Sequence, residues 1–363
     1  MLFRHYINPV FCAYYIYAAF FILTSPYKKI GPLSMAHKLI LDEIQRQIDS
    51  GLIQGASIRT NLSPEPIVMG IQAGEIPMTA GSRFDIASAG KVFTAGCAAL
   101  LSLAGEIDLD APFTEYLPEH DLGKDCNVTL RDLGAHASGF DNSKPYIDPD
   151  PVIYMEKISH WIPVNPRRTS FIYSCGNYAL LGKILERVSG MDLDRLARKL
   201  IWEPLQMNDT TWNAPGPGPL EVQHHNPTRE PGLHNDEVCF QANIPLGNGS
   251  LFSTAGDMYL FLKDIIERKV FPGAFYDLML KEEFRCGEAR RSFGWDMSLD
   301  GIPRGLSSQT IYHTGFTGQS IFADPATGIC GAVLTSRKGN WDEAKKARCR
   351  IMELMIASHK SGK

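Results

Sequence analysis

The spacing of hydrophobic positions changes several times along the first hundred residues. Residues 36–49 place apolar side chains three or four positions apart, which is the period of one face of a helix. Two short runs, 56–60 and 67–71, are typical of strands and are separated by a proline-containing turn. A strongly apolar stretch over 92–103 ends at Gly105, which predicts a helix with a glycine stop. This part of the chain therefore predicts a helix, a strand pair and a buried helix.

The rest of the chain changes from a helical pattern to a strand pattern. Helices are predicted over 130–136, 152–161, 177–188, 193–202 and 254–268, the last with Ser253 as its N-cap. Strands are predicted over 293–297, 310–313, 320–323 and 329–335, followed by an amphipathic helix over 341–359. We therefore expect an α/β fold, in which an antiparallel sheet formed by both ends of the chain is flanked by helices. An all-α subdomain, roughly 108–270, is inserted between them.

The N-terminal segment has a different character from the rest. Residues 10–23 form an unbroken apolar run between Arg4 and Lys28. This run is shorter than the roughly 20 residues that span a bilayer and suits the core of a signal peptide. Two interpretations stay open: export or membrane association through residues 8–24, or translation from Met35 and a cytoplasmic protein. We expect a leader over 1–34 and a single catalytic domain over 35–360.

Composition narrows the range of partners. Hydrophobic residues make up 44% and charged residues 21%, and 36 basic against 40 acidic residues give a net charge of −4. The basic stripe with interleaved aromatic residues that is typical of nucleic-acid binding is absent from the sequence. Eight cysteines without a C-x-x-C pair argue against a disulfide scaffold and against a thiolate zinc site. We expect a small-molecule ester or amide substrate, no cofactor and no nucleic acid; the oligomeric state stays open.

Ser88 and Lys91 form an S-x-x-K pair at the start of the predicted apolar helix. Because the two residues are three positions apart, the lysine lies one turn further on the same face. Its ammonium then lowers the cost of deprotonating a serine hydroxyl, which is otherwise a weak nucleophile. The same pattern recurs at Ser25 and Lys28 with no apolar helix behind it. The pair alone is therefore as compatible with chance as with function.

Tyr173 directly precedes the helix predicted over 177–188. A phenol is a poor base at neutral pH, but a cation about 4 Å away at an effective dielectric of 20 supplies about 4 kcal/mol. Lys91 is such a cation, so the pair is sufficient for proton transfer. Taken alone, Tyr173 is more simply interpreted as one of thirteen packed tyrosines.

His313, Thr314 and Gly315 end a predicted strand and lead into a segment, TGFTG, with two glycines. Glycine allows a backbone to pass close to a ligand. The N–H of Phe316 would then face a developing oxyanion together with the N–H of Ser88. The simpler alternative is a turn at the end of a strand.

These pieces, in this order, resemble the serine β-lactamase and penicillin-binding-protein superfamily. The similar branch is the class C-like one, with AmpC-type β-lactamases, D-alanyl-D-alanine carboxypeptidases and family VIII esterases. The resemblance runs from about residue 36 to 358 and includes 84–88, 130–133, 136–139, 178–182, 249–254 and 313–318. It implies a β-lactamase/transpeptidase-like fold. It also implies Ser88 as nucleophile, Lys91 as its activating partner, Tyr173 as general base and then acid, and His313, Thr314 and Gly315 as the wall beside the substrate.

Two departures from this pattern bear on the substrate. Cys175 stands where the family usually has an asparagine that hydrogen-bonds the substrate amide, and a thiol is a weak donor. His313 stands where a lysine is usual, and a mostly uncharged histidine holds a carboxylate less firmly. We expect a serine hydrolase that acts through an acyl-enzyme on a small ester or amide. The alternatives are a β-lactamase or D-alanyl-D-alanine carboxypeptidase, and a catalytically silent membrane-anchored relative.

A metal-dependent hydrolase is a further alternative. His224, His225 and His234 lie close in sequence to Asp236 and Glu237. Adjacent histidines on a loop rarely converge on one ion, and the chain has no H-E-x-x-H helix. We therefore expect no metal.

Overall fold

The computed structural model describes residues 35–143, 148, 150–213, 229–242 and 244–361. The leader over 1–34, its membrane association, and His224 and His225 lie outside the described residues. Within the described ranges, no helix combines the length and the apolar character that crossing a membrane requires.

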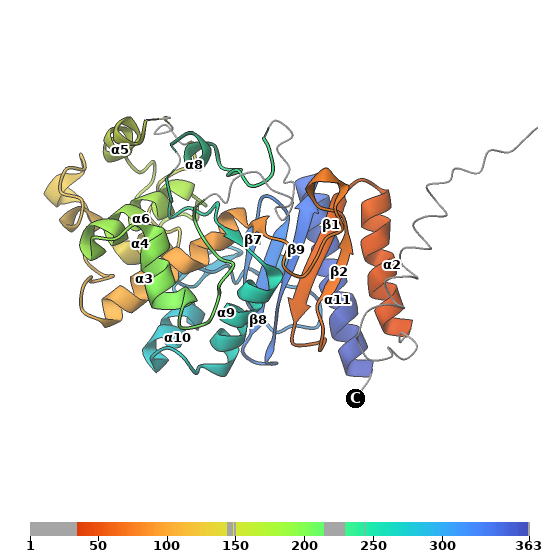
Figure 1. Ribbon diagram of the computed structural model, residues 1–363. Helices are drawn as coiled ribbons and strands as arrows, with labels where there is room; N and C mark the ends of the chain where they lie inside the picture. The colour runs from red at the N-terminus through yellow and green to blue at the C-terminus, as the bar shows by residue number, and fades with distance from the viewer. Residues whose placement is uncertain (1–34, 144–147, 149, 214–228, 243, 362–363) are drawn as a thin grey trace, which may run out of the picture.

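A five-stranded antiparallel sheet joins the two ends of the chain (Figure 1). Its strands are β1 (Ile53–Thr60), β2 (Ile67–Gly70), β7 (Ile311–Gly315), β8 (Gln319–Asp324) and β9 (Ile329–Arg337). They lie in the order β2-β1-β9-β8-β7, so the strand nearest the C-terminus pairs with the first strand. Every residue of β9 is buried, as expected for a central strand that is covered on both faces. The expected α/β fold with an antiparallel sheet is confirmed.

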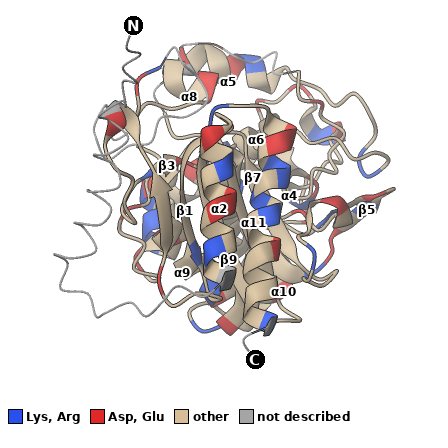
Figure 2. Cartoon of the chain, turned by 90° about the vertical axis from the view of Figure 1, so that its right-hand side faces the viewer, with Lys and Arg blue, Asp and Glu red and all other residues tan. Residues whose placement is uncertain are grey.

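Helices cover both faces of this sheet. α2 (Met35–Asp49) and α11 (Trp341–Ser361) lie side by side over one face (Figure 2). Side chains from both helices, including Ile44 and Ile351, form an apolar layer against strand residues such as Val333. α9 (Ala255–Glu267) packs against β1, β8 and β9 and contributes to the larger core on the other face.

The remaining elements form the helical part of the molecule. They are α3 (Lys91–Leu103), α4 (Leu130–Gly134), α5 (Pro151–Ser159), α6 (Cys175–Ser189), α7 (Leu193–Ala197) with a π-helical turn (Arg198–Trp202), α8 (Glu237–Ala242) and α10 (Gly273–Leu280). Two short strand pairs accompany them, β3 (Phe84–Asp85) with β4 (Phe252–Ser253) and β5 (Phe284–Cys286) with β6 (Ala289–Arg291).

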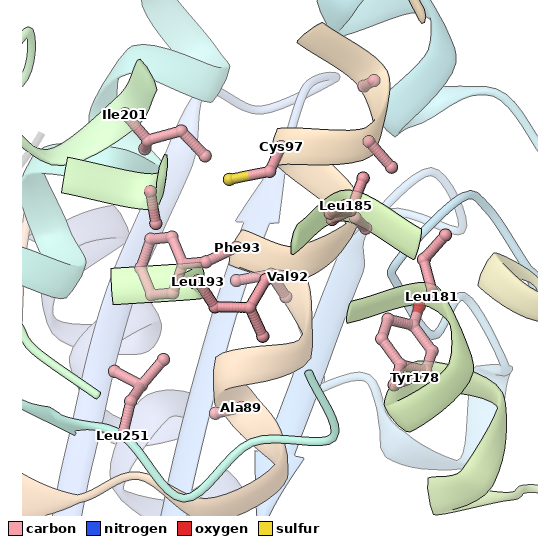
Figure 3. Close-up of a cluster of buried hydrophobic side chains, with 14 of the residues drawn as sticks. Ala89, Val92, Phe93, Cys97, Tyr178, Leu181, Leu185, Leu193, Ile201 and Leu251 are labelled. Atoms are coloured by element: carbon pink, nitrogen blue, oxygen red, sulfur yellow. The ribbon is translucent and has the colours of Figure 1, made fainter. Parts of the chain in front are cut away.

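α3 lies in the middle of the larger core. Its sequence is apolar around almost the whole circumference, and such a helix is stable only when it is surrounded. Figure 3 shows Val92, Phe93 and Cys97 of this helix among side chains that include Leu185 and Ile201. The first turn of α3 is therefore held rigidly, and that turn follows Ser88 directly.

Two local predictions were wrong. The N-cap of α9 is Thr254, whose side chain accepts the Asp257 N–H at 3.1 Å, because Ser253 is part of β4. The strand predicted over 293–297 does not form; only Asp296 makes isolated bridges there. Gly294 has a φ of +96°, which takes the chain out of the extended conformation.

Candidate active site

Ser88 lies in a 3-10 turn, Ala87–Gly90, that continues into α3. The carboxylate of Asp85 accepts the N–H of Ala87 at 2.8 Å, and the carbonyl of Ala87 accepts the N–H of Ser250 at 3.1 Å. Ala87 has a φ of +46°, a conformation that is uncommon for a residue with a side chain. The hydrogen bonds on either side of Ala87 stabilise this turn and fix Ser88 at the wall of a pocket.

Lys91 is fully buried directly behind Ser88. Its Nζ donates to the Ser88 Oγ at 2.9 Å, to the Cys175 Sγ at 3.7 Å and to the main-chain oxygen of Asn248. An ammonium has three hydrogens, so all of them are engaged. Burial alone would lower the pKa of Lys91, but the electrostatic influence of the neighbouring Cys175 and Tyr173 side chains outweighs burial and raises this pKa above its ordinary value. Lys91 is therefore a cation held against the serine hydroxyl.

Tyr173 lies next to this cation, as the sequence reasoning required. The Lys91 Nζ is 5.1 Å from the centroid of the Tyr173 ring. The ring of His136 packs on Tyr173 with 4.5 Å between centroids, and His313 lies 6.4 Å away. Burial lowers the pKa of His136 well below its usual range, so this neighbour is neutral. Lys91 thus places a positive charge beside Tyr173.

Strand β7 forms the opposite wall. The backbone of the TGFTG segment makes a close approach to the turn that carries Ser88. A side chain at Gly315 would overlap the carbonyl oxygen of Ile86, two residues before Ser88. Thr317 donates from its Oγ1 to the carbonyl of Asp85 at 2.6 Å. These contacts hold β7 against the turn that carries Ser88, and Phe316 lies at the pocket with half of its surface exposed.

The pocket between these walls has a volume of about 550 Å³. Of the predicted site residues, Ser88, Tyr173, Cys175, His313, Thr314 and Phe316 line it, Lys91 lies behind it, and Gly315 is absent from its lining. Sequence reasoning missed several lining residues: Asn142, Asn235, Asn248, Arg291, Asp296, Trp341 and Lys345. Asp236 and Glu237, which were considered above only as metal ligands, also line the pocket. Asn248 directly precedes the 249–254 stretch of the resemblance, and that proximity was the only available signal.

His313 is neutral in this environment. Its Nδ1 lies 3.0 Å from the carbonyl oxygen of Thr314. Burial, together with the positive charges of Lys91 and Arg291, lowers the pKa of His313 to about 3. The expectation of an uncharged histidine at this wall therefore agrees with its surroundings.

The metal alternative finds no support in the described part of the chain. No group of three potential ligands converges there. His234 donates from Nδ1 to the carbonyl of Ser250 at 2.7 Å, and the Asp236 carboxylate accepts the N–H groups of Val238 and Cys239. Glu237 pairs with Arg229.

Comparison with known proteins identifies the family of this chain. The model of the beta-lactamase family matches residues 50–353. This chain belongs to the beta-lactamase family. A curated relative, the N-acetylmuramyl-L-alanine amidase of Bacillus subtilis (strain 168), is 25% identical over 310 residues, which cover 72% of this chain and 69% of the relative.

Solved structures show the same fold at lower sequence identity. A class C beta-lactamase superposes with a TM-score of 0.75 at 18% identity and covers 92% of this chain and 98% of its own. EstCE1, described as a hydrolase with promiscuous acyltransferase activity, has a TM-score of 0.74 at 18% identity and covers 89% and 98%. The predicted membership of the serine β-lactamase and penicillin-binding-protein superfamily is confirmed.

Proposed function

We propose that this beta-lactamase-family hydrolase transfers the acyl group of a small ester to Ser88 and then releases it to water. The observation that carries the proposal is the 2.9 Å contact between the Lys91 ammonium and the Ser88 Oγ at the wall of an open pocket, with Tyr173 beside the same cation. A serine hydroxyl needs an adjacent base and a stabilising charge to become a nucleophile.

In the proposed mechanism, Tyr173 accepts the proton of Ser88 as the Oγ attacks the ester carbonyl. Lys91 stays protonated and stabilises the negative charge that moves between the serine and the phenol. The N–H groups of Ser88 and Phe316 stabilise the carbonyl oxygen as it becomes negative. Tyr173 then gives its proton to the leaving alcohol, and the acyl-enzyme is hydrolysed by the reverse sequence with water.

The two departures from the family pattern support an ester over a β-lactam or a D-alanyl peptide. The Cys175 thiol is already a hydrogen-bond partner of Lys91 and is a weak donor to a substrate amide. His313 is neutral and does not supply the charge that a carboxylate needs. A short ester carries neither an amide arm nor a carboxylate, so it loses nothing at either position.

The test is hydrolysis of p-nitrophenyl butyrate by the full chain, together with intact-mass spectrometry after addition of a slow ester. We expect an acyl adduct and turnover in the wild type, and neither in Ser88→Ala. Ser102→Ala, at the distal end of α3, is the matched control and should keep both. An adduct that persists in Ser88→Ala, or wild-type hydrolysis that does not exceed the buffer rate, would contradict the proposal.

A further inference from the structure

One hydrogen-bond acceptor at the pocket wall is the free ring nitrogen of His313. A carbonyl oxygen only accepts hydrogen bonds, so the contact between Nδ1 and the Thr314 oxygen places the hydrogen on Nδ1. The neutral ring then carries its lone pair on Nε2. His313 is 5% exposed and lines the pocket. Among the described residues, no donor is hydrogen-bonded to this Nε2.

A second acceptor is the side-chain oxygen of Asn248, which is 8% exposed and also lines the pocket. Its amide nitrogen faces the Asp236 carboxylate at 3.4 Å, which sets the orientation of the amide group. Its Oδ1 is buried and has no hydrogen-bond partner in the described part of the chain. Buried acceptors are almost always paired, so this oxygen beside the pocket is an acceptor that a donating group of a ligand would satisfy.

The charges around His313 decide what kind of group it can bind. Lys91 of α3 and Arg291 of β6 act on it, and the centroid of the Tyr173 ring lies 6.4 Å from that of His313. With its pKa lowered to about 3, His313 is neutral at pH 7. The ring therefore does not donate to a carboxylate. The pocket lining also carries the carboxylates of Asp236 and Asp296. A neutral donor such as a hydroxyl matches the lone pair of His313 whatever the balance of these charges.

We propose that the pocket binds short-chain esters of polyhydroxylated alcohols, with one hydroxyl donating to the Nε2 of His313 and another to the Oδ1 of Asn248. This inference rests on the ester hydrolysis proposed above and names its substrate class. A volume of about 550 Å³ is sufficient for an ester of glycerol or of a small sugar.

The test compares three butyrate esters of similar size: 2-hydroxyethyl, propyl and carboxymethyl butyrate. The kcat/KM of the full chain is measured for each in a pH-stat at pH 7.5. A neutral hydrogen bond in a buried site corresponds to about a 2–10-fold gain, so the hydroxyethyl ester should exceed the propyl ester by that factor. The carboxymethyl ester should be the slowest. A hydroxyethyl ester no better than the propyl ester would overturn the inference.

Two substitutions at one position separate recognition from general damage. His313→Gln keeps a neutral acceptor and should keep the preference for the hydroxyethyl ester. His313→Lys replaces the acceptor by a charged donor and should favour the carboxymethyl ester. His160→Lys, on the exposed end of α5, is the control and should leave the wild-type order unchanged. The same order in all four proteins would refute the role of His313.

Binding to Ser88→Ala, measured by titration calorimetry with the same three esters, separates this inference from the proposed function. Preferential binding of the hydroxyethyl ester without wild-type turnover would support the recognition site and contradict the hydrolase. Turnover in the wild type with equal binding and equal kcat/KM for all three esters would support the hydrolase and refute the recognition site.

Discussion

Replacement of the buried cation tests whether Lys91 and Tyr173 act as one unit. In Lys91→Met the ammonium disappears while a side chain of similar length remains. The Lys91 Nζ lies 5.1 Å from the centroid of the Tyr173 ring. A charge pair at about this separation and an effective dielectric of 20 is worth about 3 kcal/mol. The charged hydrogen bond from Lys91 to Ser88 adds about 1.5–3 kcal/mol. We therefore expect kcat/KM to fall about 10³–10⁴-fold.

The assay is a double-mutant cycle on p-nitrophenyl butyrate with the wild type, Lys91→Met, Tyr173→Phe and the double variant. If the cation acts through the phenol, the coupling of about 3 kcal/mol makes the double variant about 200-fold more active than the product of the single losses predicts. Lys183→Met removes a partly exposed lysine from α6 and should change little. Single losses that simply multiply would refute a coupled pair.

Three further predictions concern the pocket walls. Cys175→Asn should raise kcat/KM on amide-bearing β-lactams such as nitrocefin relative to p-nitrophenyl butyrate, because the asparagine restores a side-chain amide that can pair with the substrate amide. Wild-type protein that cleaves nitrocefin at least as well as p-nitrophenyl butyrate would contradict this prediction. The pKa of His313 is lower in the folded protein than in the unfolded chain, so on acidification the unfolded chain binds a proton at His313 first. The contribution of His313 to the free energy of unfolding is therefore complete above about pH 6.5. It is lost as the pH falls towards 3, at up to about 1.4 kcal/mol per pH unit. The free energy of unfolding, measured by urea denaturation at pH 7, 6 and 5, should fall less steeply with decreasing pH in His313→Gln than in the wild type. An equal pH dependence in the two proteins would refute the buried neutral state. Gly315→Ala should lower kcat/KM more than about 10-fold, because the added methyl group would displace the carbonyl of Ile86. Gly256→Ala is the control and should change kcat/KM little, because that position has room for a methyl group. Equal effects of the two substitutions would contradict the packing described for β7.

The sequence by itself determined the features that depend on neighbours along the chain. Ser88 and Lys91 are three residues apart, so the geometry of one helical turn brings their side chains together whatever the rest of the molecule does. The continuously apolar α3 and the strand-like runs of β1 and β9 are likewise visible in the residue pattern, because burial selects side chains position by position. The superfamily was identified from the order of the motifs, which can also be read directly along the chain.

Only the tertiary structure decided which distant groups complete the pocket. Asn248 binds Lys91 across 157 residues of chain, and no local rule relates the two positions. The strand expected over 293–297 does not form for a related reason. Gly294 has a positive φ and packs closely against Ala95 of α3, and the hydrophobic pattern of the sequence contains no sign of either feature. The state of His313 is the clearest case. Its identity was known from the sequence, but its missing charge and its free lone pair arise from burial and from two cations that folding places beside it.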